Sequence, residues 1–84
     1  MFDLKIISPQ AIVYEDKSEM LTAPGIYGEF SVLTGHAPLV TVLKKGRLKI
    51  GKGPSVKNID IDEGFLEVAK DKVTVLFKQT AEGR

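Results

Sequence analysis

Cysteine is absent from the 84 residues, and His36 is the only histidine. The chain therefore cannot form disulfides, thiolate metal sites or a cysteine nucleophile, and a small domain without disulfides suits a reducing compartment. No apolar run approaches the roughly 20 residues that span a bilayer. The N-terminus also lacks a basic segment followed by an apolar one, so no secretory signal is visible. We expect a cytoplasmic chain.

An excess of one charge is also missing. The 12 Lys and Arg residues nearly balance the 11 Asp and Glu residues, which leaves a net charge of +1. This balance does not by itself require nucleic acid or a membrane surface as a partner. At this length the chain has room for one domain, residues 1–84, and its hydrophobic content of 43% indicates a folded globular domain.

Helical periodicity over three turns is found nowhere in the chain, which instead contains a series of short strand patterns. The range 11–23 fits two strands or one bulged strand equally well. Turn residues interrupt the patterns roughly every 8–12 residues, which favours an all-β sandwich or small barrel. Lys45-Gly46 predicts a hairpin turn. The predicted strands cover residues 2–7, 11–23, 29–33, 39–43, 47–50, 56–61, 65–69 and 72–77.

Residues 44–52 hold the densest basic cluster, which could bind nucleic acid or an acidic patch on a protein. Proteins that bind single strands usually place aromatic side chains beside such a cluster. No aromatic residue occurs between Phe30 and Phe65. A solvated hairpin that protects a sheet edge is therefore the favoured interpretation, and a small β-barrel nucleic-acid binder remains the alternative.

Catalysis has little support in the sequence. His36 could be a general base, but no nucleophile motif surrounds it, so a turn histidine bonded to local backbone is favoured. Asp60, Asp62 and Glu63 could in principle bind a metal, although with one histidine and no cysteine they are better explained as turn acids. We expect neither enzyme activity nor a cofactor.

The stretch from Gly28 to Thr41 reads GEFSVLTGHAPLVT and resembles the signature of the epsilon subunit of F-type ATP synthases. A second block, Gly64 to Leu76, resembles a later motif of the same family. Ser31 and Thr34 replace the usual glycine and proline, and Glu63 replaces the first glycine of a pair. If position 63 requires a positive φ, glutamate there would be strained.

This resemblance implies a ten-stranded β-sandwich of two packed sheets with no substantial helix. It identifies residues 1–84 with the N-terminal domain of the family and implies that the C-terminal helical domain is absent. The implied function is that of a non-catalytic central-stalk, or rotor, subunit that couples proton-driven rotation to ATP synthesis. The implied location is the cytoplasmic side of the bacterial inner membrane, with membrane association only through the complex and no role for nucleic acid.

Individual residues carry the implied contacts. Gly28, Glu29 and Phe30 match the family's contact with the ring of c subunits, and an exposed carboxylate there suits basic or amide side chains of a loop. Ser8, His36 and Thr41 match positions that face the gamma subunit. No catalytic, cofactor-binding or metal-binding residue is implied.

Overall fold

The computed structural model describes residues 1–79, and the patternless tail from Thr80 lies outside this range. Within it the all-β prediction is confirmed, since the chain forms nine strands and only a short 3₁₀ turn, η1 (Gly53–Ser55). The strands are β1 (Phe2–Ile7), β2 (Ile12–Ser18), β3 (Met20–Gly25), β4 (Gly28–Leu33), β5 (Leu39–Leu43), β6 (Gly46–Ile50), β7 (Lys57–Ile61), β8 (Glu63–Ala69) and β9 (Lys72–Lys78).

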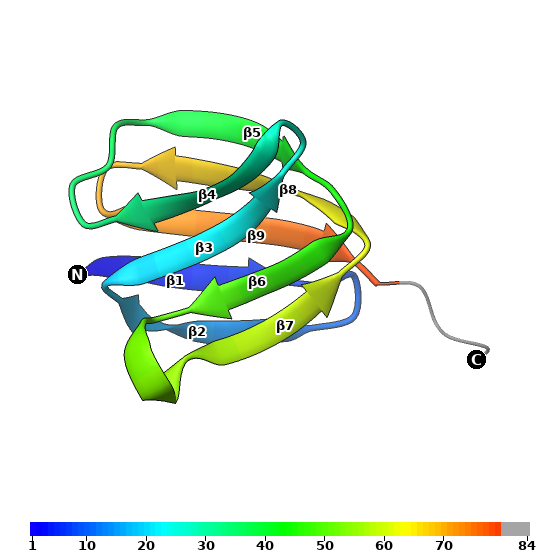
Figure 1. The fold of residues 1–84 in the computed structure, drawn as a ribbon, viewed down its shortest axis with the longest axis horizontal. Coiled ribbons are helices and arrows are strands. Elements are labelled where there is room, and N and C mark those ends of the chain that lie inside the picture. The colour runs from blue at the N-terminus through cyan, green and yellow to red at the C-terminus, as the bar shows by residue number, and fades with distance from the viewer. Residues whose placement is uncertain (80–84) are drawn as a thin grey trace.

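The strands form two layers (Figure 1). One layer has the order β2-β1-β9-β8-β5, and the other has the order β4-β3-β6-β7. Neighbouring strands are antiparallel except β1 and β9, which run parallel. The layers are hydrogen-bonded to each other where β3 meets β5, at the single pair Gly25–Leu43. The implied β-sandwich is therefore confirmed, and it is built from one strongly curled sheet of nine described strands, where the resemblance implied ten strands in two packed sheets.

The predicted hairpin at Lys45-Gly46 is wrong. β5 pairs with β8 and β6 pairs with β7, so the two strands are not hydrogen-bonded to each other. Instead the chain bends between them and continues along β3 in the other layer, where the Lys44 N–H donates to the Pro24 carbonyl at 2.9 Å. Gly46 permits this bend, because a Cβ there would lie 2.7 Å from Pro24 Cβ.

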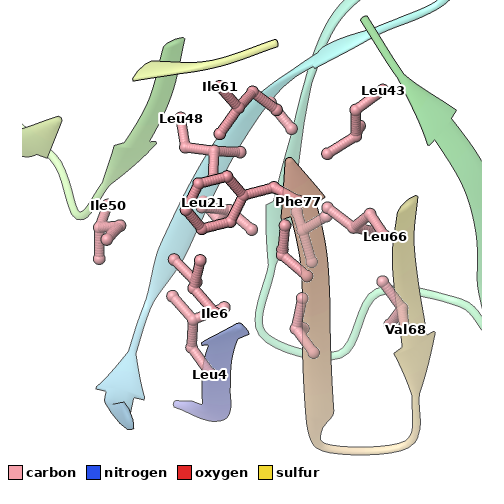
Figure 2. Packing of buried hydrophobic residues seen from close by; sticks show 14 of the residues in the cluster. Leu4, Ile6, Leu21, Leu43, Leu48, Ile50, Ile61, Leu66, Val68 and Phe77 are labelled. Atoms are coloured by element: carbon pink, nitrogen blue, oxygen red, sulfur yellow. The ribbon is translucent and has the colours of Figure 1, made fainter. Parts of the chain in front are cut away.

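The range 11–23 forms two strands in different layers. The change of layer occurs at Ser18, which is buried and whose hydroxyl donates to the Met20 carbonyl at 2.9 Å. This bond gives the Met20 carbonyl a hydrogen-bond partner at the point where the strand pairing of β2 ends and that of β3 begins. The alternation of side chains along the strands then places one apolar row from each layer inside (Figure 2). Leu4, Ile6, Leu21, Leu48 and Leu66 are all nearly fully buried there.

Charged side chains mark the register of three strand pairs. Lys5 faces Glu15 across β1 and β2, Arg47 faces Asp60 across β6 and β7, and Glu63 faces Lys78 across β8 and β9. Each of these directly opposed pairs forms an ion pair, at 3.7, 2.9 and 3.7 Å respectively. Opposite charges facing each other stabilise this register and disfavour a slip by one residue. Glu63 itself has no positive φ, so the strain considered for that position is not present.

Asp3 and Lys17 form a fourth opposed pair, and they give a testable pH dependence. The Lys17 Nζ donates to Asp3 Oδ1 at 2.8 Å, and this hydrogen bond lowers the pKa of Asp3 below its usual 3.8. Its stabilising contribution is therefore present above that pKa and is lost as pH falls through the lowered value. We expect Asp3→Asn to lower the unfolding midpoint at pH 6 and to match the parent protein near pH 2. Thermal unfolding at low salt measures this, and a difference that grew with acidification would contradict it.

Candidate docking surface

The structure exposes a segment without charge. From Phe30 to Leu43 there is no Asp, Glu, Lys or Arg, although 27% of the whole chain is charged. The segment comprises most of β4, the connecting loop and β5, which lie together at the upper side of Figure 1. Leu33 is 53% exposed and Val40 72% exposed. Contiguous patches of exposed apolar side chains mark interaction sites on soluble proteins.

This segment also contains two strand edges. β4 pairs with β3 alone, and β5 pairs with β8 and otherwise only at Leu43. The two opposite edge strands, β2 and β7, instead carry charges, among them Glu15, Lys17 and Asp60. Charged side chains on an edge strand prevent pairing with other chains. The edges therefore differ in charge, since β2 and β7 carry several charged side chains, β4 carries only Glu29 and β5 carries none.

A row of outward-facing apolar residues extends from this segment across the layer formed by β2, β1, β9, β8 and β5. Five residues are directly opposed in the register from β5 to β2: Val42, Phe65, Leu76, Ile7 and Ile12. Phe65 is 57% exposed and Leu76 50% exposed. The strand patterns in the sequence did not reveal this row, because its members come from strands far apart in the chain and only the pairing aligns them.

Two of the three residues predicted to face gamma lie in the uncharged segment. His36 belongs to the β4–β5 loop, where its N–H donates to the Leu33 carbonyl at 3.0 Å and its Nδ1 lies 2.7 Å from the Ala37 carbonyl. Thr41 is half-buried in β5, opposite Leu66. Ser8 lies elsewhere, in the β1–β2 turn, and its hydroxyl bonds to Ala11 at 3.2 Å. Both hydrogen-bonded side chains therefore shape local turns.

The three residues predicted to contact the ring have different roles in the structure. Gly28 has a φ of +135° and closes the β3–β4 hairpin, and Phe30 is half-buried and packs against the core. Glu29 is exposed, and its Oε2 lies 3.6 Å from Lys49 Nζ. Glu29 also lines an open groove of about 1160 Å³ together with Arg47 and Asp60. Of the three, only Glu29 places a charged group at the surface.

Most of the basic cluster is neutralised within the chain. Arg47 donates to Asp60 at 2.9 Å, which raises the pKa of Arg47, and Lys49 is paired with Glu29. Lys52 lies 4.0 Å from Glu19. These carboxylates interrupt any continuous positive surface for a phosphate backbone. Among residues 1–79 no group of three or more His, Asp or Glu side chains is placed to hold a metal ion.

Residues 1–83 match the family described as the beta-sandwich domain of the ATP synthase Delta/Epsilon chain. The chain belongs to this family. The matched range includes both resemblance motifs, so the resemblance seen in the sequence is confirmed. The prediction of a chain that is not itself an enzyme is confirmed as well, because the family consists of non-catalytic subunits of the synthase.

Curated epsilon chains resemble this domain over most of its length. The ATP synthase epsilon chain of Geobacter metallireducens is 43% identical over 77 residues, which is 92% of this chain and 55% of that protein. The one from Magnetococcus marinus is 32% identical over 82 residues, which is 98% of this chain and 60% of that protein. The delta/epsilon β domain described here thus spans a little over half the length of these relatives.

Solved structures show the same fold at lower identity. A chain in the mitochondrial ATP synthase central stalk and c ring of Tetrahymena thermophila aligns with a TM-score of 0.76 at 16% identity, covering 92% of this chain and 63% of that one. A chain of the Euglena gracilis mitochondrial enzyme aligns with a TM-score of 0.81 at 23% identity, covering 88% and 48%. The β-sandwich of the epsilon-type domain is therefore the fold of this chain.

Proposed function

We propose that this chain is the β domain of a rotor subunit in a proton-translocating F-type ATP synthase, docked between the gamma subunit and the c ring. The family match and the names of the curated relatives support the assignment to the synthase. The segment from Phe30 to Leu43 supports a docking role, since it carries no charged side chain and exposes Leu33, Val40 and Val42. The role is mechanical: the domain transmits torque and performs no bond chemistry.

The gamma subunit is the proposed partner of the uncharged segment. Val40 and Val42 project outward from β5, and Phe65 and Leu76 continue the apolar surface across β8 and β9. Burying such a surface stabilises a permanent complex in proportion to the apolar area removed from water. The His36 loop lies at the end of β4, and its local hydrogen bonds give it a defined shape for docking.

The c ring is the proposed partner of the end that carries Glu29. This end contains the β3–β4 hairpin, so Glu29 follows directly after a turn that projects from the sheet. The described residues contain no helix with the length and hydropathy needed to span a bilayer. In this proposal the ring attaches the domain to the cytoplasmic face of the bacterial inner membrane, and no cofactor takes part.

Binding to gamma should be sensitive to charge at one strand edge. We expect Val40→Asp to weaken binding to purified cognate gamma by about tenfold or more, because a carboxylate would be desolvated in an apolar interface. His36→Ala should weaken binding less, since its side chain bonds within its own loop. Titration calorimetry measures both effects.

The matched control is Val13→Asp, which places the same charge on the opposite edge strand, β2, where Val13 is 46% exposed. Binding should then be unchanged. Equal losses for both variants would remove the uncharged segment from the interface. Failure of the folded parent chain to bind folded gamma would overturn the proposed function itself.

A further inference from the structure

The outer face of the layer β2-β1-β9-β8-β5 is organised in rows of directly opposed side chains, and its strands can be followed in Figure 1. The apolar row crosses all five strands, from Val42 on β5 to Ile12 on β2. Phe65, Leu76 and Ile12 are 57%, 50% and 52% exposed. Because opposed side chains on neighbouring strands touch, the row forms one continuous patch. Such a patch on a sheet face suits packing against a second sheet.

The row beside it is polar and carries its charges in a particular order. Lys5 is paired with Glu15 at 3.7 Å, whereas Glu67 forms no ion pair with any other of residues 1–79. The central strand β9 therefore has a carboxylate on its β8 side and an ammonium group on its β1 side. In strand order from β5 to β2 the members of this polar row are Val40, Glu67, Thr74, Lys5 and Glu15.

This order of charges is self-complementary. When two copies pack face to face, a two-fold axis along β9 places β5 of one copy over β2 of the other. Leu76 then meets Leu76 of the second copy on the axis, and Glu67 lies over the second copy's Lys5, twice in the dimer. An axis along the apolar row would instead set Glu67 against the second copy's Glu63. Charge therefore selects the axis along β9.

A hollow at the β5 end of the apolar row has the shape to take the opposite end of the second copy. Its volume is about 660 Å³, and Ile26, Val42 and Phe65 form part of its apolar lining. With the axis along β9, Ile12 of the second copy lies over this hollow. The charged side chains around the hollow have both signs, so the rim favours neither an anion nor a cation: Lys44, Lys45, Lys78, Asp62 and Glu63.

We propose that, in the absence of gamma, two copies of this chain associate face to face through the apolar row around the two-fold axis along β9. A net charge of only +1 does not oppose this association. Lys72 and Lys78 also lie on β9, and each has a carboxylate neighbour in its own chain, Asp3 and Glu63 respectively. The patch is small for a permanent interface, so the dissociation constant of the dimer is on the order of 10 μM.

The dimer covers part of the surface that the proposed function assigns to gamma. The dimer itself is independent of that assignment, and only its competition with gamma rests on the proposed function. The free chain then keeps Phe65 and Leu76 away from water until gamma takes the place of the second copy. A weak interface suits this exchange, because it dissociates readily when a tighter partner is present.

Sedimentation velocity of the full chain over a concentration series tests the dimer. The mass of the parent chain should rise toward twice the 9.2 kDa of one chain. Leu76→Asp places two carboxylates on the axis and should weaken association at least about tenfold. The matched control is Leu33→Asp, because Leu33 is 53% exposed but lies on β4 in the other layer, and it should associate like the parent. Circular dichroism checks that both variants are folded.

A charge exchange tests the axis. Glu67→Lys and Lys5→Glu should each weaken association about fivefold or more at low salt, since each sets like charges against one another twice in the dimer. The double variant Lys5→Glu, Glu67→Lys should recover most of the parent's association. Lys5→Glu also removes the ion pair with Glu15 inside the chain, so the recovery is the decisive result.

The outcomes separate the dimer from the proposed function. A parent chain that remains monomeric at millimolar concentration would overturn the dimer. Unchanged association of Leu76→Asp would remove the apolar row from the interface, and absence of recovery in the charge exchange would overturn the axis. Purified cognate gamma should convert the dimer into a complex with one copy of each chain, and a complex that retains two copies of this chain would overturn the competition. Failure of folded gamma to bind would overturn the proposed function and leave the dimer standing.

Discussion

Replacing Leu66 with alanine is expected to lower the free energy of unfolding by about 3–4 kcal/mol, the upper part of the range for buried leucines. Leu66 is fully buried in β8, and its side chain lies among Leu43, Val68 and Phe77 in the core (Figure 2). Ladders on both sides, to β5 and to β9, hold its strand in place, so the backbone cannot collapse into the cavity that the change leaves. A domain of this size buries only about 60% of its unfolded surface, and its total stability is about 5 kcal/mol or a little more.

Urea denaturation followed by circular dichroism measures this effect, and Leu76→Ala is its control. Leu76 lies on the adjacent strand β9 but faces outward and is 50% exposed. Its replacement should cost about 1 kcal/mol or less, since it leaves no enclosed cavity. If Leu66→Ala lowered the free energy of unfolding as little as Leu76→Ala, the core would be able to repack around the missing side chain. That result would contradict the close packing of Leu66.

The second large effect is expected from Gly64→Ala, which should cost about 2–3 kcal/mol through overpacking. A Cβ at Gly64 would lie within van der Waals overlap of the Leu76 carbonyl oxygen and about 3.1 Å from Phe77 Cα. Both neighbours are backbone or next to it, and they belong to the β8–β9 ladder, so neither can rotate away. Relief requires that the two strands separate near the point where Gly64 pairs with Phe77.

Gly35→Ala provides the comparison for Gly64→Ala. Gly35 has a φ of +84°, but a Cβ there would meet no atom within 4 Å. The Gly35→Ala substitution should lower the free energy of unfolding by about 1 kcal/mol, because alanine is strained at this positive φ. Denaturation midpoints of the two variants measure the difference. A larger loss at Gly35 than at Gly64 would contradict the close approach of β8 and β9.

The structure also indicates how the domain separates stability from docking. The β2 and β7 edges carry charged residues and are connected across the layers by Lys57, whose Nζ lies 5.7 Å from the centre of the Tyr14 ring. β5 carries no charge, β4 carries only Glu29, and the His36 loop joins the two strands. One side of the sandwich is therefore closed by its own side chains, and we propose that the other is closed by a partner subunit.

The sequence alone determined the fold class and the family. Alternating apolar residues, as at Leu48 and Ile50, predicted strands because side chains along a strand point to opposite faces, and the structure confirms that both are buried. The absence of helical periodicity and of cysteine excluded helical and disulfide-stabilised folds. The motif from Gly28 to Thr41 identified the family, since its glycines, proline and histidine define a turn of particular geometry between two strands.

Tertiary structure decided which residues meet. Lys45-Gly46 was predicted to form a hairpin, because local turn chemistry cannot distinguish a chain reversal from a change of layer. In the structure β5 and β6 each pair with β3 and not with each other. Much of the positive charge of the basic cluster is compensated, because strand pairing brings Asp60 to Arg47 and Glu29 to Lys49. The exposure of Tyr27 and the apolar row through Phe65 likewise depend on register and curl. These are contacts between residues far apart in the chain, and their energy depends on packing that no local pattern contains.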